Sequence, residues 1–230
     1  MLRIAGLNME LDFREADLRR AAARKLRLPE RAVTDVKLVK KSVDARKKDR
    51  VHFVCTVEAA VDGSEEKLLA RLKDAKVQKA EPYRYEPPRA GKLPQRPVVV
   101  GFGPAGMFAA LLLAQCGQEP IVLERGQPVE EREKAVSRFW RERVLDPSSN
   151  VQFGEGGAGT FSDGKLNTGT GDARIRKVLE ELVKAGAPEE ILVDAKPHIG
   201  TDRLPGVVKN IREQILALGG EVRFSTRVTG

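Results

Sequence analysis

Two hydrophobic periods alternate along the N-terminal part of the chain. Apolar side chains recur at every second position where a strand is expected, and at every third or fourth position where a helix is expected. The predicted order is strand, helix, strand, strand, helix, strand over residues 2–8, 13–26, 33–43, 51–61, 64–72 and 77–85. Ser64 is expected to cap the second helix. This order predicts an α+β domain in which two helices cover one face of a sheet.

A different pattern begins at residue 97. Residues 98–100 are three consecutive valines, which is typical of a parallel strand buried on both faces. A glycine turn follows at residues 101–106, then an apolar helix to about residue 116 and a second strand at residues 121–123. Strand, helix and strand in this order predict the first part of a parallel α/β sheet.

Each position of the glycine turn has a physical role. Gly101 permits a tight turn out of the strand, and Gly103 lets a diphosphate approach the backbone without meeting a Cβ atom. Gly106 allows the helix to pack closely on the strand. Pro104 suits a first helical turn, and the free N–H groups from Ala105 onward favour an anion.

An acid closes the second strand. Glu124 follows Gly106 at close to the separation at which a carboxylate accepts hydrogen bonds from adenosine ribose hydroxyls. A carboxylate at this place disfavours a 2′-phosphate. The segment from residue 97 to residue 126 is therefore predicted to bind a dinucleotide.

A second glycine-rich segment covers residues 153–171, where glycine is the most frequent residue. This composition indicates a loop whose backbone can approach a ligand closely. Residues 159–165 also match the first seven positions of a nucleoside-triphosphate phosphate loop. Leu166 occupies the eighth position, where a hydroxyl must reach Mg²⁺, which argues against an ATPase. A loop that binds no ligand remains an alternative.

The Gly-Pro-Ala-Gly turn and the ending Glu124-Arg125-Gly126 resemble FAD-binding flavoproteins of the glutathione-reductase-like superfamily. The loop at residues 153–171 narrows this resemblance to poorly characterised bacterial FAD-dependent dehydrogenases with an N-terminal extension. The resemblance implies that Arg125 approaches adenine or phosphate and that the backbone of Val228, in a final strand, contacts adenine. It also implies flavin contacts from Gly156, Gly157, Gly159, Thr160, Phe161, Ser162 and Lys165.

The sequence offers no clear catalytic acid or base. His198, in a turn, and Lys165, in the glycine loop, are the two candidates for holding a substrate anion or moving a proton. Cys55 and Cys116 lie far apart in the sequence, so neither a redox disulfide nor a metal cluster is expected. The resemblance implies FAD-dependent hydride transfer, with NAD(P)H as a possible electron donor and an unknown substrate.

Charge divides the chain in two. Residues 1–97 hold 24 Lys and Arg against 15 Asp and Glu, whereas residues 98–230 hold 17 against 18. We therefore predict a basic ferredoxin-like domain at residues 1–80 and a proline-rich linker at residues 81–96. The third part, residues 97–230, is predicted to be a Rossmann-like FAD/NAD(P)-binding domain that is incomplete at its C-terminus.

The basic domain raises the alternative of a nucleic-acid-binding or docking module fused to a non-catalytic dinucleotide-binding fragment. Its third strand carries one large aromatic residue, Phe53, so base stacking on the sheet has little support and docking is favoured. Neither an apolar run long enough to cross a bilayer nor a secretory signal occurs, so a cytoplasmic protein without a membrane span is expected. The oligomeric state stays open.

The segment after Glu124 predicts an amphipathic helix over residues 128–144. Trp140 is expected to lie in the core on its apolar side. Arg132, on the charged side, is expected to form exposed ion pairs, with an approach to adenine or phosphate as the alternative.

Overall fold

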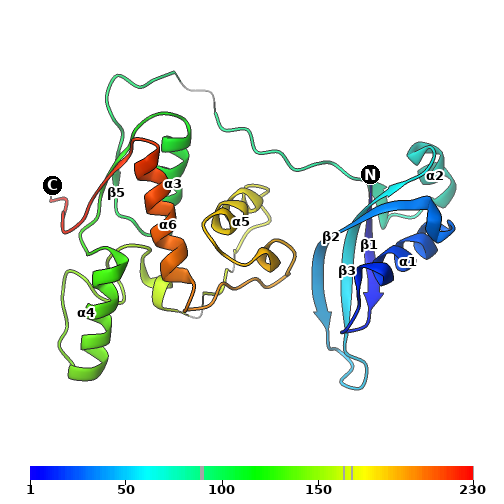
Figure 1. Cartoon of the computed structure of the whole chain (residues 1–230), viewed down its shortest axis with the longest axis horizontal. Coiled ribbons are helices and arrows are strands. Elements are labelled where there is room, and N and C mark those ends of the chain that lie inside the picture. The colour runs from blue at the N-terminus through cyan, green and yellow to red at the C-terminus, as the bar shows by residue number, and fades with distance from the viewer. Residues whose placement is uncertain (89–90, 163, 167, 230) are drawn as a thin grey trace. The chain divides into compact units, whose positions relative to one another are not determined.

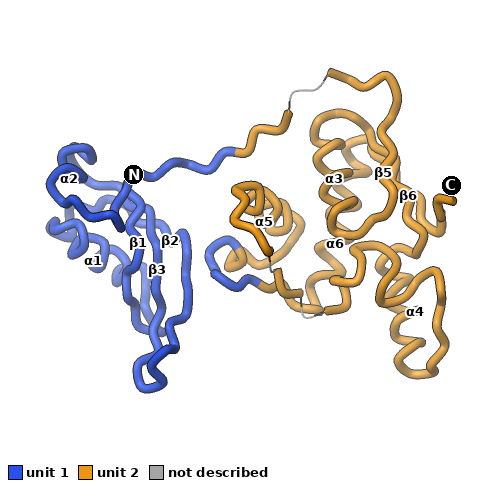
Figure 2. The backbone as a smooth tube through the Cα atoms, turned by 180° about the vertical axis from the view of Figure 1, so that it is seen from behind, with its two compact units in different colours: residues 1–84, 192–197 blue, residues 85–191, 198–230 orange. Residues whose placement is uncertain are grey.

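The computed structural model describes residues 1–88, 91–162, 164–166 and 168–229 of the chain. They form two compact units (Figure 2), of which unit 1 comprises Met1–Arg84 with Leu192–Pro197, and unit 2 comprises Tyr85–Ile191 with His198–Gly230. The protein is mixed α/β, because unit 1 contains an antiparallel sheet and unit 2 a parallel one (Figure 1). No helix among the described residues is long and apolar enough to cross a membrane.

Unit 1 is a four-stranded sheet with two helices. The strands lie in the order β2-β3-β1-β4, and each neighbouring pair is antiparallel. Its elements are β1 (Leu2–Met9), α1 (Glu15–Leu26), η1 (Glu30–Ala32), β2 (Val33–Asp44), β3 (His52–Val61), α2 (Glu65–Leu72) and β4 (Val77–Lys79). The predicted cap is confirmed, since the Ser64 hydroxyl accepts a hydrogen bond of 3.3 Å from the Lys67 N–H.

One face of this sheet is apolar because alternate strand residues point to the helices. The buried side chains of β1, β3 and α1 form the core of unit 1: Leu2, Ile4, Leu7, Cys55, Val57, Ala59, Leu18, Ala22 and Leu26. Phe53 is on this covered side, where its ring meets that of Phe13 edge-on at 5.9 Å between centroids. The segment Leu192–Pro197 extends the sheet locally, since the Lys41 N–H donates to the Val193 carbonyl at 2.7 Å.

Unit 2 is built on a three-stranded parallel sheet in the order β5-β6-β7. Its strands are β5 (Val98–Val100), β6 (Ile121–Leu123) and β7 (Glu221–Arg223). Its helices are α3 (Pro104–Gln115), α4 (Val129–Glu142), α5 (Ile175–Lys184) and α6 (Leu204–Ala217), with a 3₁₀ turn η2 (Ala158–Phe161). Helices α3 and α6 pack on each other and contact the sheet (Figure 1).

Among the described residues, helices α3 and α6 cover one face of the sheet of unit 2, and the other face is exposed. Val99 and Val122 pack into the core with Leu111 and Ile211 of the two helices. Val98 and Val100 point to the opposite face and are 57% and 65% exposed. The prediction that all three valines are buried is therefore wrong for the described residues, because α3 and α6 both lie on the face of Val99.

The last strand is shorter than predicted. β7 ends at Arg223, where its backbone carbonyl accepts from the Glu124 N–H at 2.9 Å. Val228 follows the strand and is 50% exposed. The structure therefore places Val228 outside the regular sheet, and its contact with adenine stays a prediction.

Candidate functional site

The turn between β5 and α3 has the close packing expected of its glycines. Gly101 has a φ of +90°, which a residue with a side chain rarely adopts. A Cβ atom on Gly106 would overlap the Gly101 carbonyl oxygen and lie 3.3 Å from Val99 Cγ1. Helix α3 therefore begins directly against β5.

The N-terminus of α3 is open to a ligand. Pro104 and Ala105 are exposed, and no side chain caps the helix at Gly103. A Cβ atom on Gly103 would meet only the Gly157 Cα atom, at 3.9 Å, so the backbone here has space in front of it. N–H groups of a first helical turn lack partners within the helix and attract anions.

The glycine-rich loop folds onto this same turn. The Gly156 N–H donates to the Phe102 carbonyl at 2.8 Å. Gly157 has a φ of +69°, and a Cβ atom on it would stand 3.2 Å from Gly103 Cα and 3.0 Å from Pro104 Cδ. Two glycine motifs that are distant in the sequence thus form one surface.

Glu124 is fixed beside the turn. Its carboxylate is buried, at 4% exposure, and accepts backbone hydrogen bonds from Phe102 at 2.7 Å and Gly126 at 2.8 Å. A carboxylate has about four lone-pair sites, so this arrangement leaves acceptor capacity for hydroxyl groups.

The guanidinium of Arg125 lies on the aromatic ring of Phe153. Its guanidinium carbon stands 3.8 Å from the centroid of Phe153, and one terminal nitrogen donates to the Pro147 carbonyl at 3.1 Å. The Nε atom is buried and has no hydrogen-bond partner among the described residues.

Arg132 corrects an expectation from the sequence. Its side chain is 0% exposed and donates to the carbonyls of Asn150 at 2.8 Å, Val151 at 2.8 Å and Glu155 at 2.5 Å. The predicted exposed ion pair is wrong because α4 turns Arg132 inward together with two buried valines, and the loop supplies carbonyls that need donors. Trp140, predicted in the core, is 54% exposed. That prediction is wrong because α4 has no buried residue after Val136.

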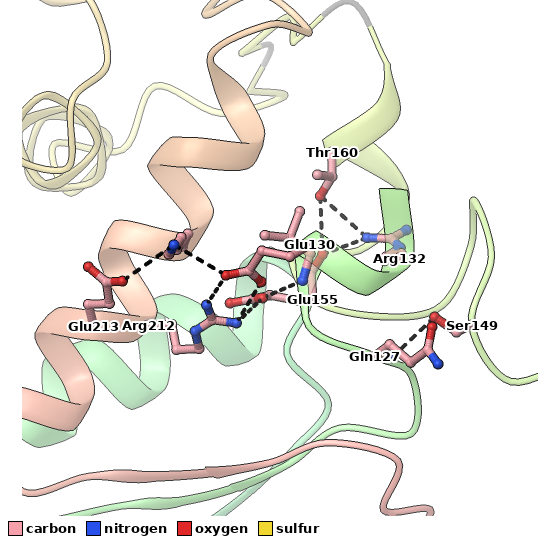
Figure 3. Close-up of polar contacts among 10 residues, drawn as sticks. Gln127, Glu130, Arg132, Ser149, Glu155, Thr160, Arg212 and Glu213 are labelled. Carbon is pink, nitrogen blue, oxygen red and sulfur yellow. Dashed lines mark hydrogen bonds and ion pairs between the residues drawn. The ribbon is translucent and has the colours of Figure 1, made fainter. Parts of the chain in front are cut away.

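Glu155 lies at the centre of a buried charge network (Figure 3). Its Oε2 atom accepts from the Val129 N–H at 2.7 Å and from Arg212 Nη1 at 2.8 Å. Arg212 also pairs with Glu130 at 2.7 Å. The Oε1 atom of Glu155 is buried without a partner among the described residues, and burial raises the pKa of this carboxyl to about 7.

This pKa predicts an unusual dependence of stability on pH. The folded chain keeps the Glu155 proton between pH 4.5 and about 7, whereas the unfolded chain has lost it. The free energy of unfolding should therefore fall as the pH rises through this range, by up to about 3 kcal/mol at about 1.4 kcal/mol per unit. Denaturation at pH 5 and pH 7.5 measures this, and the fall should be absent in Glu155→Gln. An equal fall in that variant would contradict the assignment.

A cavity of about 510 Å³ lies next to the turn and the loop. Seven of the predicted cofactor residues line it: Pro104, Ala105, Gly156, Gly159, Thr160, Ser162 and Lys165. The rest of the wall is mostly apolar and comes from α3, α5 and α6, together with Gly164, Leu166 and Thr168 of the loop. Thr160 is buried, and Phe161 lies under the Arg132 guanidinium at 4.8 Å.

The two candidate catalytic residues are neighbours, which their spacing in the sequence does not reveal. Lys165 and His198 face each other in an antiparallel backbone bridge, and the Ile199 N–H donates to the Gly164 carbonyl at 3.0 Å. Both side chains are exposed. Asp163 and Asn167, within the predicted loop, lie outside the described residues.

The proteins that this chain is similar to have no described activity. Residues 1–60 match a family described as a domain of unknown function (DUF8436). An uncharacterised protein of Clostridium beijerinckii (strain ATCC 51743 / NCIMB 8052) is 46% identical over 229 residues, which cover 99% of this chain and 43% of that protein. The chain thus spans less than half the length of this relative. Among the described residues, no group of three His, Cys, Asp or Glu side chains is arranged to hold a metal ion.

Proposed function

We propose that this chain is the FAD-binding part of an FAD-dependent oxidoreductase. In this proposal residues 97–230 belong to a Rossmann-like dinucleotide-binding domain and residues 1–80 form a ferredoxin-like domain. The observation that carries it is the contact of Gly156 and Gly157 with the turn at Phe102–Pro104. Glycine at these two positions lets the loop lie directly on the turn, so that both segments can face one ligand.

The residues around the turn fit the adenosine diphosphate half of FAD. The N–H groups of Ala105 and Gly106 would hold the diphosphate, and the buried carboxylate of Glu124 would accept from the ribose hydroxyls. The Arg125 guanidinium, which lies on the Phe153 ring and follows Glu124 in the chain, would lie near the adenine or the diphosphate. A bound flavin supplies hydride acceptance, while the protein supplies binding and orientation.

The loop residues fit one side of the flavin half, and the apolar wall of the cavity that they face is left for a second molecule. Gly156 and Gly159 offer backbone without side chains on this wall. The hydroxyls of Thr160 and Ser162 donate to the Glu155 and Gly159 carbonyls, which fixes the shape of the loop. Lys165 adds a positive charge at the end of this wall. We propose NAD(P)H as the electron donor.

Gly157→Ala should weaken FAD binding at least about tenfold, since the added carbon would force the loop away from Gly103 and strain a positive φ. Titration of the purified chain with FAD, followed by flavin fluorescence, measures this. Gly169→Ala is the matched control, because Gly169 is in the same loop and a Cβ atom there meets nothing within 4 Å. Equal FAD affinity in the two variants would contradict a role of this loop in holding the flavin, and tighter binding of NAD than of FAD by the wild-type chain would favour NAD as the cofactor.

For unit 1 we propose a docking role in preference to RNA binding. RNA-recognition sheets stack bases on exposed aromatic side chains of their central strands. Phe53 packs against Phe13 on the side that the helices cover. The open face instead carries small and polar side chains, including Thr56 and the Arg3–Glu58 ion pair.

A further inference from the structure

The cavity of unit 2 has two chemically different walls. The wall made by α3, α5 and α6 is apolar and includes Met107, Phe108, Ile175, Val178, Leu179 and Val208. The volume of the cavity, about 510 Å³, lies within the range of small-molecule sites. Water gains few hydrogen bonds beside such side chains, so this wall favours an apolar group.

Among the described residues of the lining, the polar side chains come from the loop: Thr160, Ser162, Lys165 and Thr168. Directly opposed residues of an antiparallel pair have Cβ atoms about 4.5 to 5.5 Å apart and project to the same face. His198 is opposite Lys165 in the antiparallel backbone bridge, so the two residues lie side by side next to the part of the cavity wall that Lys165 lines.

The cavity also begins at the place where the cofactor is proposed to bind. Pro104 and Ala105, the first two residues of α3, are part of its lining. A molecule in the cavity would therefore lie next to a group held at the N-terminus of this helix. This neighbourhood suits a substrate that exchanges electrons with a bound cofactor.

We propose that the substrate is an apolar carboxylic acid, whose body fills the apolar part of the cavity and whose carboxylate is held by Lys165 and His198. The inference rests on the proposed function, because it names the substrate class of the same site. An ammonium group and an imidazole provide donors for a carboxylate, and the apolar wall provides burial for a chain or ring.

Calorimetric titration of the full chain with octanoate tests the proposal, with octanamide as a neutral probe of the same length. Octanoate should bind saturably and at least about tenfold more tightly than octanamide. Lys165→Met should remove this preference. Leu179→Trp should abolish octanoate binding by filling the cavity, whereas Leu216→Trp, at a site on α6 that is 45% exposed and outside the lining, should leave it unchanged.

FAD titration of the same variants separates the two proposals. Retained FAD binding in Leu179→Trp, together with lost octanoate binding, supports a separate substrate cavity. Competition between octanoate and FAD, or loss of both in Leu179→Trp, would assign the cavity to the flavin and overturn the inference. Absence of saturable octanoate binding would overturn it too. Failure of the wild-type chain to bind FAD would count against the proposed function alone.

Discussion

Arg132→Met is expected to lower the free energy of unfolding of unit 2 by about 3 to 5 kcal/mol, because each buried acceptor left without a donor costs about 1 to 3 kcal/mol. Methionine fills a similar volume but donates no hydrogen bond. Three loop carbonyls that now accept from the guanidinium, those of Asn150, Val151 and Glu155, would lose their donor. Calorimetric unfolding of the purified chain measures the change.

Arg138→Met is the matched control on the same helix. Its side chain is 61% exposed and pairs with Glu142 one turn away, so its replacement should change stability by no more than about 0.5 kcal/mol. Arg132→Lys should remain destabilised, because a single ammonium group cannot reproduce the planar donor set. Equal effects at positions 132 and 138 would show that the buried network does not hold the loop.

Gly106→Ala is expected to destabilise unit 2 by at least about 2 kcal/mol and to weaken FAD binding, because overpacked groups force backbone shifts. The new methyl group would overlap the Gly101 carbonyl oxygen, which belongs to the backbone and cannot rotate away. Relief requires α3 to move from β5, and the first N–H groups of the helix move with it. Unfolding and FAD titration of the variant measure the two effects.

Gly206→Ala provides a control with the opposite sign. Gly206 is the third residue of α6, as Gly106 is of α3, but a Cβ atom on Gly206 meets nothing within 4 Å. Alanine at this position should stabilise the helix by about 0.5 to 1 kcal/mol. A stabilising effect at both positions would contradict the close contact between α3 and β5.

Local patterns in the sequence predict most elements of the fold. The strands and helices of unit 1 follow from alternating and helical periods, and Ser64 caps α2 as expected. The turn at residues 101–106 is also predictable, since each glycine has a local steric reason. These features depend on residues that are close in sequence.

Features that depend on distant contacts could not be predicted in this way. Arg132 is buried because carbonyls of a loop well beyond its own helical turn accept its hydrogen bonds, and an arginine in a charged helix face gives no sign of such partners. Val98 and Val100 read as buried, yet both helices pack on the opposite face. The bridge between Lys165 and His198 joins two irregular segments. Neither segment has a hydrophobic period that would predict their pairing.

The visible absorption spectrum of the purified chain, with the mass of any released cofactor, tests the central proposal most directly. We expect a yellow protein that releases FAD, or a colourless one that turns yellow and retains FAD after incubation and gel filtration. A colourless protein that takes up no FAD would contradict the account.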